Sequence, residues 1–254
     1  MTKLFKEGAA SAIFMDSHEK PAKLSVIIPA YNEVSTIDEL IEKVKSAKLP
    51  GVVREIVVVD DFSTDGTREK LARMKDIRVF FHDRNQGKGS TIRTGLAKAT
   101  GDIMLFQDAD LEYDPDDYSR LVEPILSGRA VVVYGLRCMK MNFRFWGNGK
   151  NILPLHYIGN KLLTLLTNIL YGRLLSDMET GYKVFKSDVV RGLHLRAKRF
   201  DLEPEITAKL LKCGYTILEV PISYSARGFE RGKKITWLDG VKAAWYLLKY
   251  RFVD

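Results

Sequence analysis

Three stretches decide the fold: LSVIIPAYNE at residues 24–33, EIVVVDDFSTDGT at 55–67 and DIMLFQDAD at 102–110. In each, a short run of Val, Ile or Leu ends in polar residues, which is typical of a buried β-strand that stops at a loop. IRVFFHD at 77–83 predicts a further strand of this kind.

Segments with helical spacing lie between these strands. They are STIDELIEKVKSA at 35–47, where Ser35 or Thr36 offers an N-terminal cap, TREKLARM at 67–74 and GSTIRTGLAKA at 89–99. Strands that alternate with helices predict an α/β fold, a mostly parallel sheet with helices on both faces. Ligands of such sheets bind beyond the carboxyl ends of the strands. We therefore expect a site where the polar clusters follow the strands.

The second half is less regular. AVVVYGLR at 130–137 predicts a strand, and YTILEVPISYSA at 215–226 predicts an edge or bulged strand because it contains Pro221. DLEPEITAKLLKCG at 201–214 predicts a helix closed by its final glycine, and residues 158–171 and 237–252 have helical patterns. We expect a loose arm at 1–22, one main domain at 23–236 and an amphipathic helix at 237–254.

Composition excludes several classes of protein. The chain has 254 residues, 46% hydrophobic and 28% charged, which suits a globular core and excludes collagenous or wholly disordered chains. Cys138 and Cys213 are too few for a disulfide framework or a four-cysteine zinc site, so we expect a reducing compartment. The net charge of +8 fits phosphate-bearing partners, although it also fits plain solubility.

The sequence predicts no membrane span. The most apolar stretch, residues 152–171, is interrupted by His, Asn and Lys, and the N-terminus lacks a secretory pattern. We expect a chain that is soluble or rests on a membrane surface.

An acid cluster follows the strand at 102–110. Asp108 and Asp110 flank Ala109, and Glu112 comes two residues later. Neighbouring carboxylates repel, so a compensating cation is expected, and Mg²⁺ or Mn²⁺ prefers such oxygen ligands. The alternative is a solvated turn that caps the next helix through Asp114 and Asp116.

Two further loops suit a nucleotide. Asp60 and Asp61 precede a Ser-Thr-Asp-Gly turn into a helix, and RNQGKGS at 84–90 places Lys88 between two glycines. Ordinary turn and cap chemistry is the alternative for the first loop, and a flexible loop ahead of a helix is the alternative for the second. The first loop contains no GxGxxG or Walker sequence, which disfavours the two common nucleotide-binding folds.

Two motifs of the second half carry charge. SDMETGYKVFK at 176–186 holds Asp177 and Glu179, and ARGFERGKKI at 226–235 is a basic loop suited to a phosphate or simply solvated.

Together these motifs resemble the family-2 glycosyltransferases of the GT-A fold. PAYNE, VVVDDFSTDGT, RNQGKG, DAD and DMETGYK occur in the family's order, and the resemblance covers about Lys23 to Arg251. The later motifs FDLEPEI, VPISY and RGFERGKKITWLDG look most like the dolichyl-phosphate mannosyl- and glucosyltransferase branch. The resemblance implies an inverting, metal-dependent hexosyltransferase with a nucleotide-sugar donor, GDP-mannose or UDP-glucose, and a polyprenyl phosphate acceptor.

The resemblance also implies a role for individual residues. Asp177 would take the place of the proposed catalytic base and Asp110 would belong to the catalytic group, while Asp108, Asp110 and Glu112 would bind Mg²⁺ or Mn²⁺. The remaining assignments concern the two substrates. Nucleotide-sugar contacts fall on Pro29, Tyr31, Glu33, Asp60 or Asp61, Lys88 and Asp108, and phosphate contacts on Arg137, Arg227 and Lys234.

A lipid phosphate is mostly a dianion at pH 7, so we expect Asp177 to orient groups rather than to act as an essential base. Many relatives continue into transmembrane helices, whereas this sequence ends at Asp254. We therefore expect a peripheral enzyme on the cytoplasmic face of a membrane, working alone or with a small membrane subunit. Its helix at 237–254, with Trp237, Val241, Trp245 and Leu248 near one face, its aromatic segment at 139–171 and the apolar residues among its first 15 would rest on lipid. The alternative is that these faces simply pack on the sheet.

Three other interpretations compete with this one. A family-2 transferase with a soluble or polysaccharide acceptor would not need the basic loop at 226–235. A nucleic-acid-binding module would be repelled by the acids around Ala109, so we expect no nucleic-acid partner. A non-catalytic relative is disfavoured because Asp108, Asp110 and Asp177 are intact.

Overall fold

The structure, a computed structural model, describes residues 21–137, 154–199, 201–226 and 237–253. The strands are β1 (Ala22–Ala30), β2 (Val52–Asp60), β3 (Arg78–Phe81), β4 (Ile103–Phe106), β5 (Val132–Arg137), β6 (Lys183–Lys186) and β7 (Leu218–Ile222). The helices are α1 (Ile37–Ser46), α2 (Thr67–Arg73), α3 (Lys88–Lys98), α4 (Tyr118–Leu126), α5 (Pro154–Tyr171), α6 (Ser187–Gly192), α7 (Leu202–Lys212) and α8 (Trp237–Phe252), with a 3₁₀ turn, η1 (Pro115–Asp117), before α4.

The strands of the described residues form one sheet in the order β3-β2-β1-β4-β6-β5-β7. Neighbouring strands are parallel except at β6, which runs antiparallel to both β4 and β5. The predicted mostly parallel α/β sheet is confirmed. Strand β6 was not predicted, because its sequence KVFK begins and ends with Lys, and one of these, Lys183, is buried.

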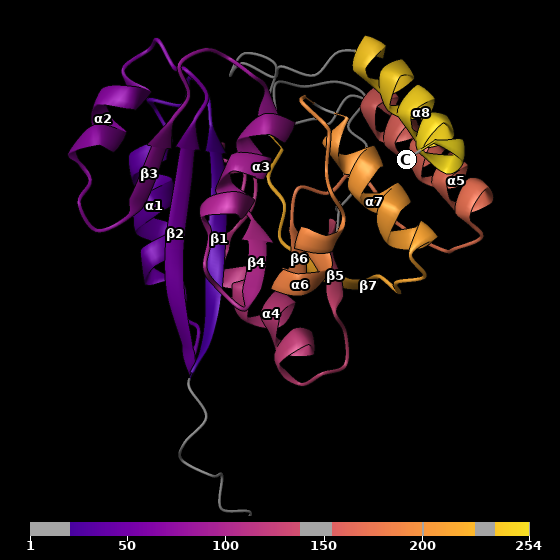
Figure 1. Cartoon of the computed structure of the whole chain (residues 1–254), viewed down its shortest axis with the longest axis horizontal. Helices are drawn as coiled ribbons and strands as arrows, with labels where there is room; N and C mark the ends of the chain where they lie inside the picture. Colours follow the sequence, from indigo (N-terminus) through magenta and orange to yellow (C-terminus); the bar gives the residue numbers. More distant parts are fainter. Residues whose placement is uncertain (1–20, 138–153, 200, 227–236, 254) are drawn as a thin grey trace, which may run out of the picture.

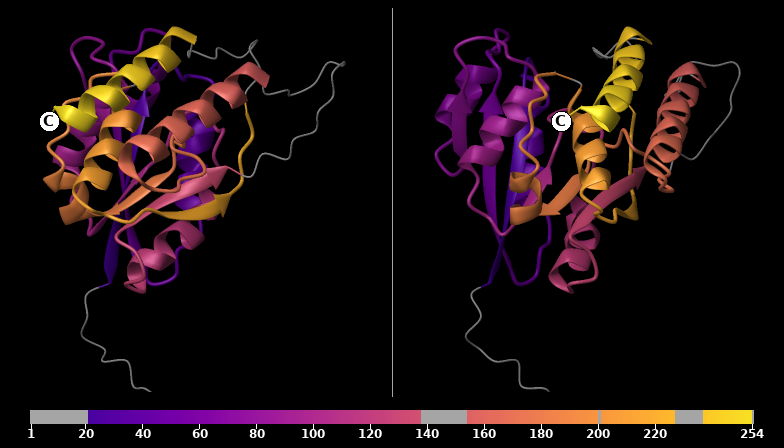
Figure 2. Two further views of the ribbon diagram at one scale, coloured as in Figure 1. Left: turned by 90° about the vertical axis from the view of Figure 1, so that its right-hand side faces the viewer. Right: turned by 45° about the vertical axis from the view of Figure 1, so that its right-hand side comes forward.

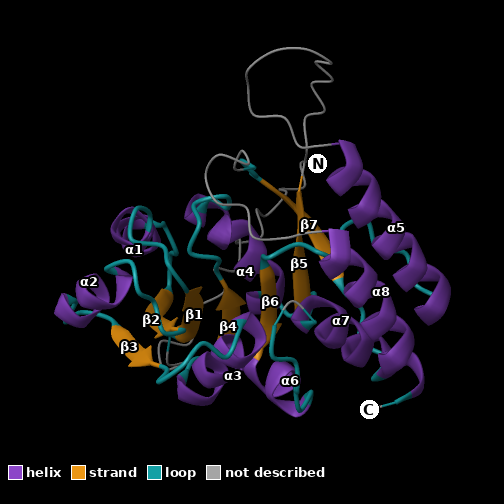
Figure 3. Cartoon of the chain, turned by 90° about the horizontal axis from the view of Figure 1, so that it is seen from above, coloured by secondary structure: helices purple, strands orange, loops and turns teal. Residues whose placement is uncertain are grey.

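Helices cover both faces of the sheet, as predicted (Figures 1 and 3). One apolar cluster joins one face to α1, α2 and α4, and a second joins the other face to α3, α6 and α7. Helices α5 and α8 pack against each other, and α8 also packs on α7 (Figures 1 and 2). Strand β7, which contains Pro221, lies at the edge of the sheet as expected.

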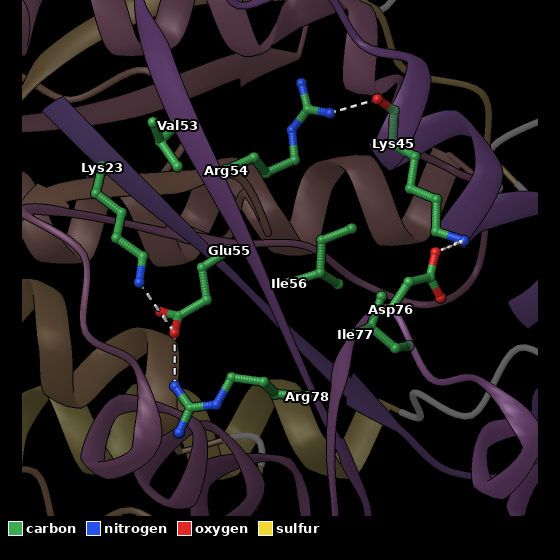
Figure 4. A pocket seen from close by; sticks show the side chains of 9 residues that line it. All are labelled: Lys23, Lys45, Val53, Arg54, Glu55, Ile56, Asp76, Ile77 and Arg78. Carbon is green, nitrogen blue, oxygen red and sulfur yellow. Dashed lines mark hydrogen bonds and ion pairs between the residues drawn. The ribbon is translucent and has the colours of Figure 1, made fainter. Parts of the chain in front are cut away.

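The amino ends of the strands surround a pocket of about 440 Å³ at the edge opposite the acid cluster (Figure 4). Its centre is Glu55, whose buried carboxylate accepts hydrogen bonds from Ser25 Oγ, Thr100 N and Thr100 Oγ1 and pairs with Arg78 and Lys23. Burial opposes this charge, but the hydrogen bonds and Arg78 outweigh it and lower the pKa of Glu55 from 4.5 to about 2. Glu55 thus ties β1, β2 and β3 to the turn that precedes β4.

We expect Glu55→Gln to lower the free energy of unfolding by roughly 2–3 kcal/mol at neutral pH, because Gln cannot retain the charged partners. The contribution of Glu55 is complete above about pH 4.5 and is lost as the pH falls toward 2. The difference between wild type and variant in urea unfolding should shrink over that range.

Glu42→Gln is the matched control, because Glu42 is an exposed acid paired with Lys45. It should change stability by less than about 0.5 kcal/mol. Equal effects of the two substitutions would contradict this assignment.

Candidate active site

The loops that follow β1, β2 and β4 meet at one edge of the sheet. Ala30 pairs with Asp60, so β1 and β2 end at the same level, and β4 ends beside Ile27, three residues before the end of β1. In each loop a residue other than glycine has a positive φ: 53° at Asn32, 66° at Phe62 and 60° at Leu111. Such backbone is costly, and its concentration at one edge indicates a functional site.

The loop after β1 is locked to the loop after β2. Asn32 Oδ1 accepts from Thr64 N at 2.9 Å, and Asn32 N donates to Ser63 Oγ at 3.0 Å. Glu33 N donates to Thr67 Oγ1 at 2.9 Å. The predicted donor-binding residues Pro29, Tyr31 and Glu33 therefore lie on one rigid wall, where Tyr31 is 37% exposed and the other two are half-buried.

The structure separates the roles of Asp60 and Asp61. Asp61 fixes the Gly-rich loop at 84–90. Its carboxylate accepts hydrogen bonds from Gln86 N and Gly87 N at 2.9 and 2.7 Å and lies 2.7 Å from His82 Nδ1. Asp60 Oδ2 accepts from Ser63 N and from Arg68. Asp60 Oδ1 is buried and has no hydrogen-bond partner among the described residues, so it is the oxygen available to a ligand.

The acid cluster after β4 is held by side chains from distant segments. Tyr118 and Tyr182 both donate to Gln107 Oε1, at 2.6 and 2.7 Å, and Gln107 Nε2 donates to the Asp108 carbonyl. Thr36 Oγ1 donates to the Ala109 carbonyl at 2.8 Å. Thr36, one of the two predicted cap residues, is the N-cap residue of α1, but its side chain makes no cap hydrogen bond and binds the acid cluster instead. Asp114, by contrast, does cap η1 through Asp116 N.

Lys88 forms an ion pair with the acid cluster. Its Nζ lies 2.8 Å from Asp108 Oδ1 and 3.0 Å from Glu203 Oε1, which comes from the first turn of α7. Burial opposes the charge of Lys88, but the two carboxylates outweigh it and raise its pKa well above the usual value. Glu203 is a site residue that the sequence analysis missed; its only indication was the FDLEPEI motif.

The acid cluster fits a divalent cation through two carboxylates. Asp108 and Asp110 offer the hard oxygen ligands of a Mg²⁺ or Mn²⁺ site in which substrate phosphates complete the shell. Glu112 is engaged differently, because Tyr224 donates to its Oε2 at 2.6 Å. Across the described ranges, no three His, Cys, Asp or Glu side chains are grouped as metal ligands, so the predicted set of three is not assembled in this structure.

Asp177 forms a buried ion pair with Arg137. The guanidinium donates through Nε and Nη2 to the two carboxylate oxygens, both at 2.6 Å, and Asn160 Nδ2 donates to Oδ1 at 3.0 Å. Burial would raise the pKa of Asp177, but Arg137 outweighs it and holds this pKa below its usual value. An ionised carboxylate shared by these donors is a weak base.

Asn160, on α5, was also missed by the sequence analysis, since nothing in its local sequence marks it as a site residue.

The structure brings most of the predicted site residues to this edge. Arg227 and Lys234, predicted to bind phosphate, lie outside the described residues, as do the first 15 residues and residues 139–153 of the aromatic segment. Arg137, predicted for the same role, is engaged by Asp177.

Comparisons with known proteins agree with this geometry. Residues 25–193 match the family model described as Glycosyl transferase family 2. Dolichol-phosphate mannosyltransferase of Pyrococcus furiosus is 30% identical over 236 residues, which are 90% of this chain and 64% of that protein. The chain thus spans less than two-thirds of that relative. A UDP-N-acetylglucosamine–dolichyl-phosphate N-acetylglucosaminyltransferase of Methanococcus voltae is 28% identical, over 83% of this chain and 89% of the relative.

A solved structure shares the fold. Glucosyl-3-phosphoglycerate synthase from Mycobacterium tuberculosis, crystallised with Mn²⁺, uridine diphosphate and phosphoglyceric acid, superposes with a TM-score of 0.70 over 92% of this chain and 80% of that chain. The two sequences are 21% identical. The sheet and its helices are therefore those of a GT-A glycosyltransferase.

We expect Arg137→Met to lower the free energy of unfolding by about 3–5 kcal/mol, because it leaves the Asp177 carboxylate buried without its cation. The double variant Arg137→Met/Asp177→Asn should recover much of the loss, since it removes the uncompensated charge. Urea unfolding of both variants and of Asp177→Asn completes the double-mutant cycle. An Arg137→Met protein as stable as the wild type would show that the pair is not formed.

Proposed function

Because the chain belongs to glycosyl transferase family 2 and is a glycosyltransferase, we propose that it transfers one hexose from a nucleotide sugar to a polyprenyl phosphate of the dolichyl type. Two relatives support this acceptor class, since dolichyl or dolichol phosphate stands in the names of both. The M. tuberculosis synthase, crystallised with a soluble phosphoglyceric acid, supports only the fold at its level of identity.

The observation that carries the proposal is the position of α5. Its inner face holds the Asp177 loop: besides Asn160, Lys161 Nζ donates to the Ser176 carbonyl at 2.8 Å, and Thr164 Oγ1 accepts from Met178 N at 3.3 Å. Its outer face exposes apolar residues at helical spacing, Ile158, Leu162, Leu165 and Ile169. One helix therefore carries the candidate acceptor site on one side and a surface suited to lipid on the other.

Helix α8 extends this apolar surface. It exposes Val241, Trp245, Leu248 and Phe252, while Ala243, Leu247 and Tyr250 are buried. Its last turn holds Lys249 and Arg251, which complement an anionic lipid surface. In the described part of the chain, no helix has the length and apolar character of a membrane span. The outer faces of α5 and α8, here called the α5/α8 face, would rest on the cytoplasmic surface of an anionic membrane, residues 237–254 serving as the interfacial helix of a domain at 23–236.

The nucleotide would lie against the wall of Pro29, Tyr31 and Glu33, with Asp60 Oδ1 accepting a hydrogen bond from its base or ribose. Asp108 and Asp110 would hold a Mg²⁺ or Mn²⁺ ion. When bound, the ion would stabilise the negative charge that grows on the departing diphosphate. Lys88, already beside Asp108, would add its charge to the same group.

The acceptor phosphate would approach from the side of Asp177 and Arg137. As a dianion it can attack the sugar without losing a proton. Asp177 would then orient Arg137 toward the phosphate rather than remove a proton, and the basic loop of Arg227 and Lys234 would complete the phosphate contacts.

A transfer assay with labelled donors tests the proposal. The protein, Mg²⁺ and a polyprenyl phosphate are incubated with GDP-mannose, UDP-glucose and UDP-N-acetylglucosamine in turn. We expect label to enter the organic phase with one donor and to stay in the aqueous phase when a chelator is added. Label that appears only in water-soluble products would favour the soluble acceptor instead.

We expect Asp177→Asn to lower kcat by about 10- to 100-fold and Asp108→Ala by at least about 1,000-fold, because the first disturbs orientation and the second removes charge stabilisation of the leaving group. Initial rates with the active donor measure both. Loss of activity as complete in Asp177→Asn as in Asp108→Ala would make Asp177 an essential base.

The α5/α8 face predicts binding to anionic vesicles. Ile169→Glu and Trp245→Glu replace residues that are 71% and 63% exposed, so the fold should survive while flotation with phosphatidylglycerol vesicles falls at least about tenfold. Leu126→Glu, on α4, is the matched control: Leu126 is 47% exposed and lies away from this face, so flotation should be unchanged. A wild-type dimer that Trp245→Glu dissociates would assign the face to a second copy.

A further inference from the structure

One acid of the DMETGYK motif has no role in the site described so far. Glu179 lies between Asp177, bound to Arg137, and Gly181, which packs so closely on Asp108 that a Cβ there would come within 2.4 Å of Oδ2. In the proposed function, Asp108 belongs to the diphosphate end and Asp177 to the acceptor end. In the sequence, Glu179 therefore lies between a residue of the acceptor end and a residue packed on the diphosphate end, where the transferred sugar would pass.

One oxygen of the Glu179 carboxyl group is left without a partner in the described part of the chain. Its Oε1 is buried and has no hydrogen-bond partner among the described residues, and no described cation pairs with it. Five other buried side-chain atoms of the described residues have no hydrogen-bond partner. Two of them are Thr180 Oγ1, from the next residue, and Asn160 Oδ1, from the α5 residue that binds Asp177. Buried polar atoms without partners are costly, so their gathering at one place indicates groups that wait for a ligand.

The backbone around Glu179 is rigidly held. The buried Lys183 Nζ donates to the carbonyls of Met178 and Thr180, one on each side of Glu179, and lies 4.4 Å from the Tyr134 ring centre. Gly181 N donates to Tyr113 Oη at 2.7 Å. Lys183 thus fixes the turn and makes no described ion pair with Glu179, which leaves the carboxyl group preorganised for a partner from outside.

The nature of that partner follows from the surrounding charge. Asp108 and Glu203 share Lys88, Asp177 is paired with Arg137, and the buried Lys183 is a third cation, so three carboxylates are balanced without a charge on Glu179. Burial and the nearby charge of Glu203 raise the pKa of Glu179, while Lys183 and Arg137 lower it. The raising effects are larger, and the pKa of Glu179 is about 7. A carboxyl group in such a place suits a neutral ligand with hydroxyl groups, to which it can donate or accept a hydrogen bond.

We propose that Glu179 binds a hydroxyl group of the transferred sugar, with Thr180 and Asn160 beside it, and so contributes to recognition of the donor. This inference rests on the proposed function. It assigns Glu179 to the sugar and leaves the nucleoside and diphosphate to Asp60, Lys88 and the acid cluster.

Calorimetric titration in Mg²⁺ with four probes, GDP, GDP-mannose, UDP and UDP-glucose, tests the proposal. The quantity compared is the ratio of the Kd of the diphosphate to that of its sugar conjugate. In Glu179→Ala this ratio should fall about tenfold for the preferred donor, while the Kd of the diphosphate alone changes less than twofold. Glu179→Gln, which keeps the shape and half the hydrogen-bonding capacity, should give about a threefold fall even if the Ala variant does not fold.

Glu219→Gln is the matched control. Glu219 accepts hydrogen bonds from Ser176 N and Asp177 N of the same loop, and the proposal gives it no contact with the sugar. The ratio of the diphosphate Kd to the Kd of its sugar conjugate should be the same in Glu219→Gln as in the wild type. An unchanged ratio in both Glu179 variants, equal weakening of diphosphate and sugar conjugate, or a wild type with no preference for the conjugate would each overturn the inference alone. A wild type that binds none of the four probes would overturn the proposed function and the inference with it.

Discussion

The double ion pair of Lys88 holds the two halves of this molecule in one site. Asp108 follows β4, Glu203 opens α7, and the ammonium group of Lys88 lies within 3.0 Å of both. Without it, two largely buried carboxylates would face each other at high cost. A second buried acid is compensated in the same way, because Arg137 at the end of β5 forms an ion pair with Asp177. Crowded acids at the carboxyl edge are tolerable because Asp108 and Glu203 share the cation of Lys88, and Asp177 has that of Arg137.

The two edges of the sheet divide stability from chemistry. At the amino edge, Glu55 has several donors and no oxygen left over, so it stabilises the fold and offers nothing to a ligand. At the carboxyl edge, Asp60 and Glu179 keep buried oxygens that have no hydrogen-bond partner in the part of the chain that the structure describes, and Leu111 keeps a strained backbone. A stable scaffold can bear such unsatisfied groups where a substrate will satisfy them.

Much of the fold could be predicted because periodicity and strand ends are local properties. The strands before Asp60 and Asp108 and the edge strand with Pro221 were predictable on that basis. Other features depend on pairs far apart in the chain. Thr36 resembles a helix cap but binds the Ala109 carbonyl, and nothing near Glu203 announces that it will meet Lys88. Strand β6 escaped prediction because buried Lys183 breaks its apolar pattern, and the division of labour between Asp60 and Asp61 required the hydrogen bonds themselves.

The central claim is that the carboxyl edge of β1, β2 and β4 binds the diphosphate of the donor through the acid cluster. Crystals grown with Mn²⁺ and a nucleoside diphosphate would test it directly, because the anomalous signal of manganese locates the ion without reference to activity. We predict one strong peak in contact with carboxylate oxygens of Asp108 and Asp110 and with the diphosphate, and the nucleoside beside Asp60. A manganese peak elsewhere in the molecule, or a diphosphate bound away from Lys88, would contradict the account.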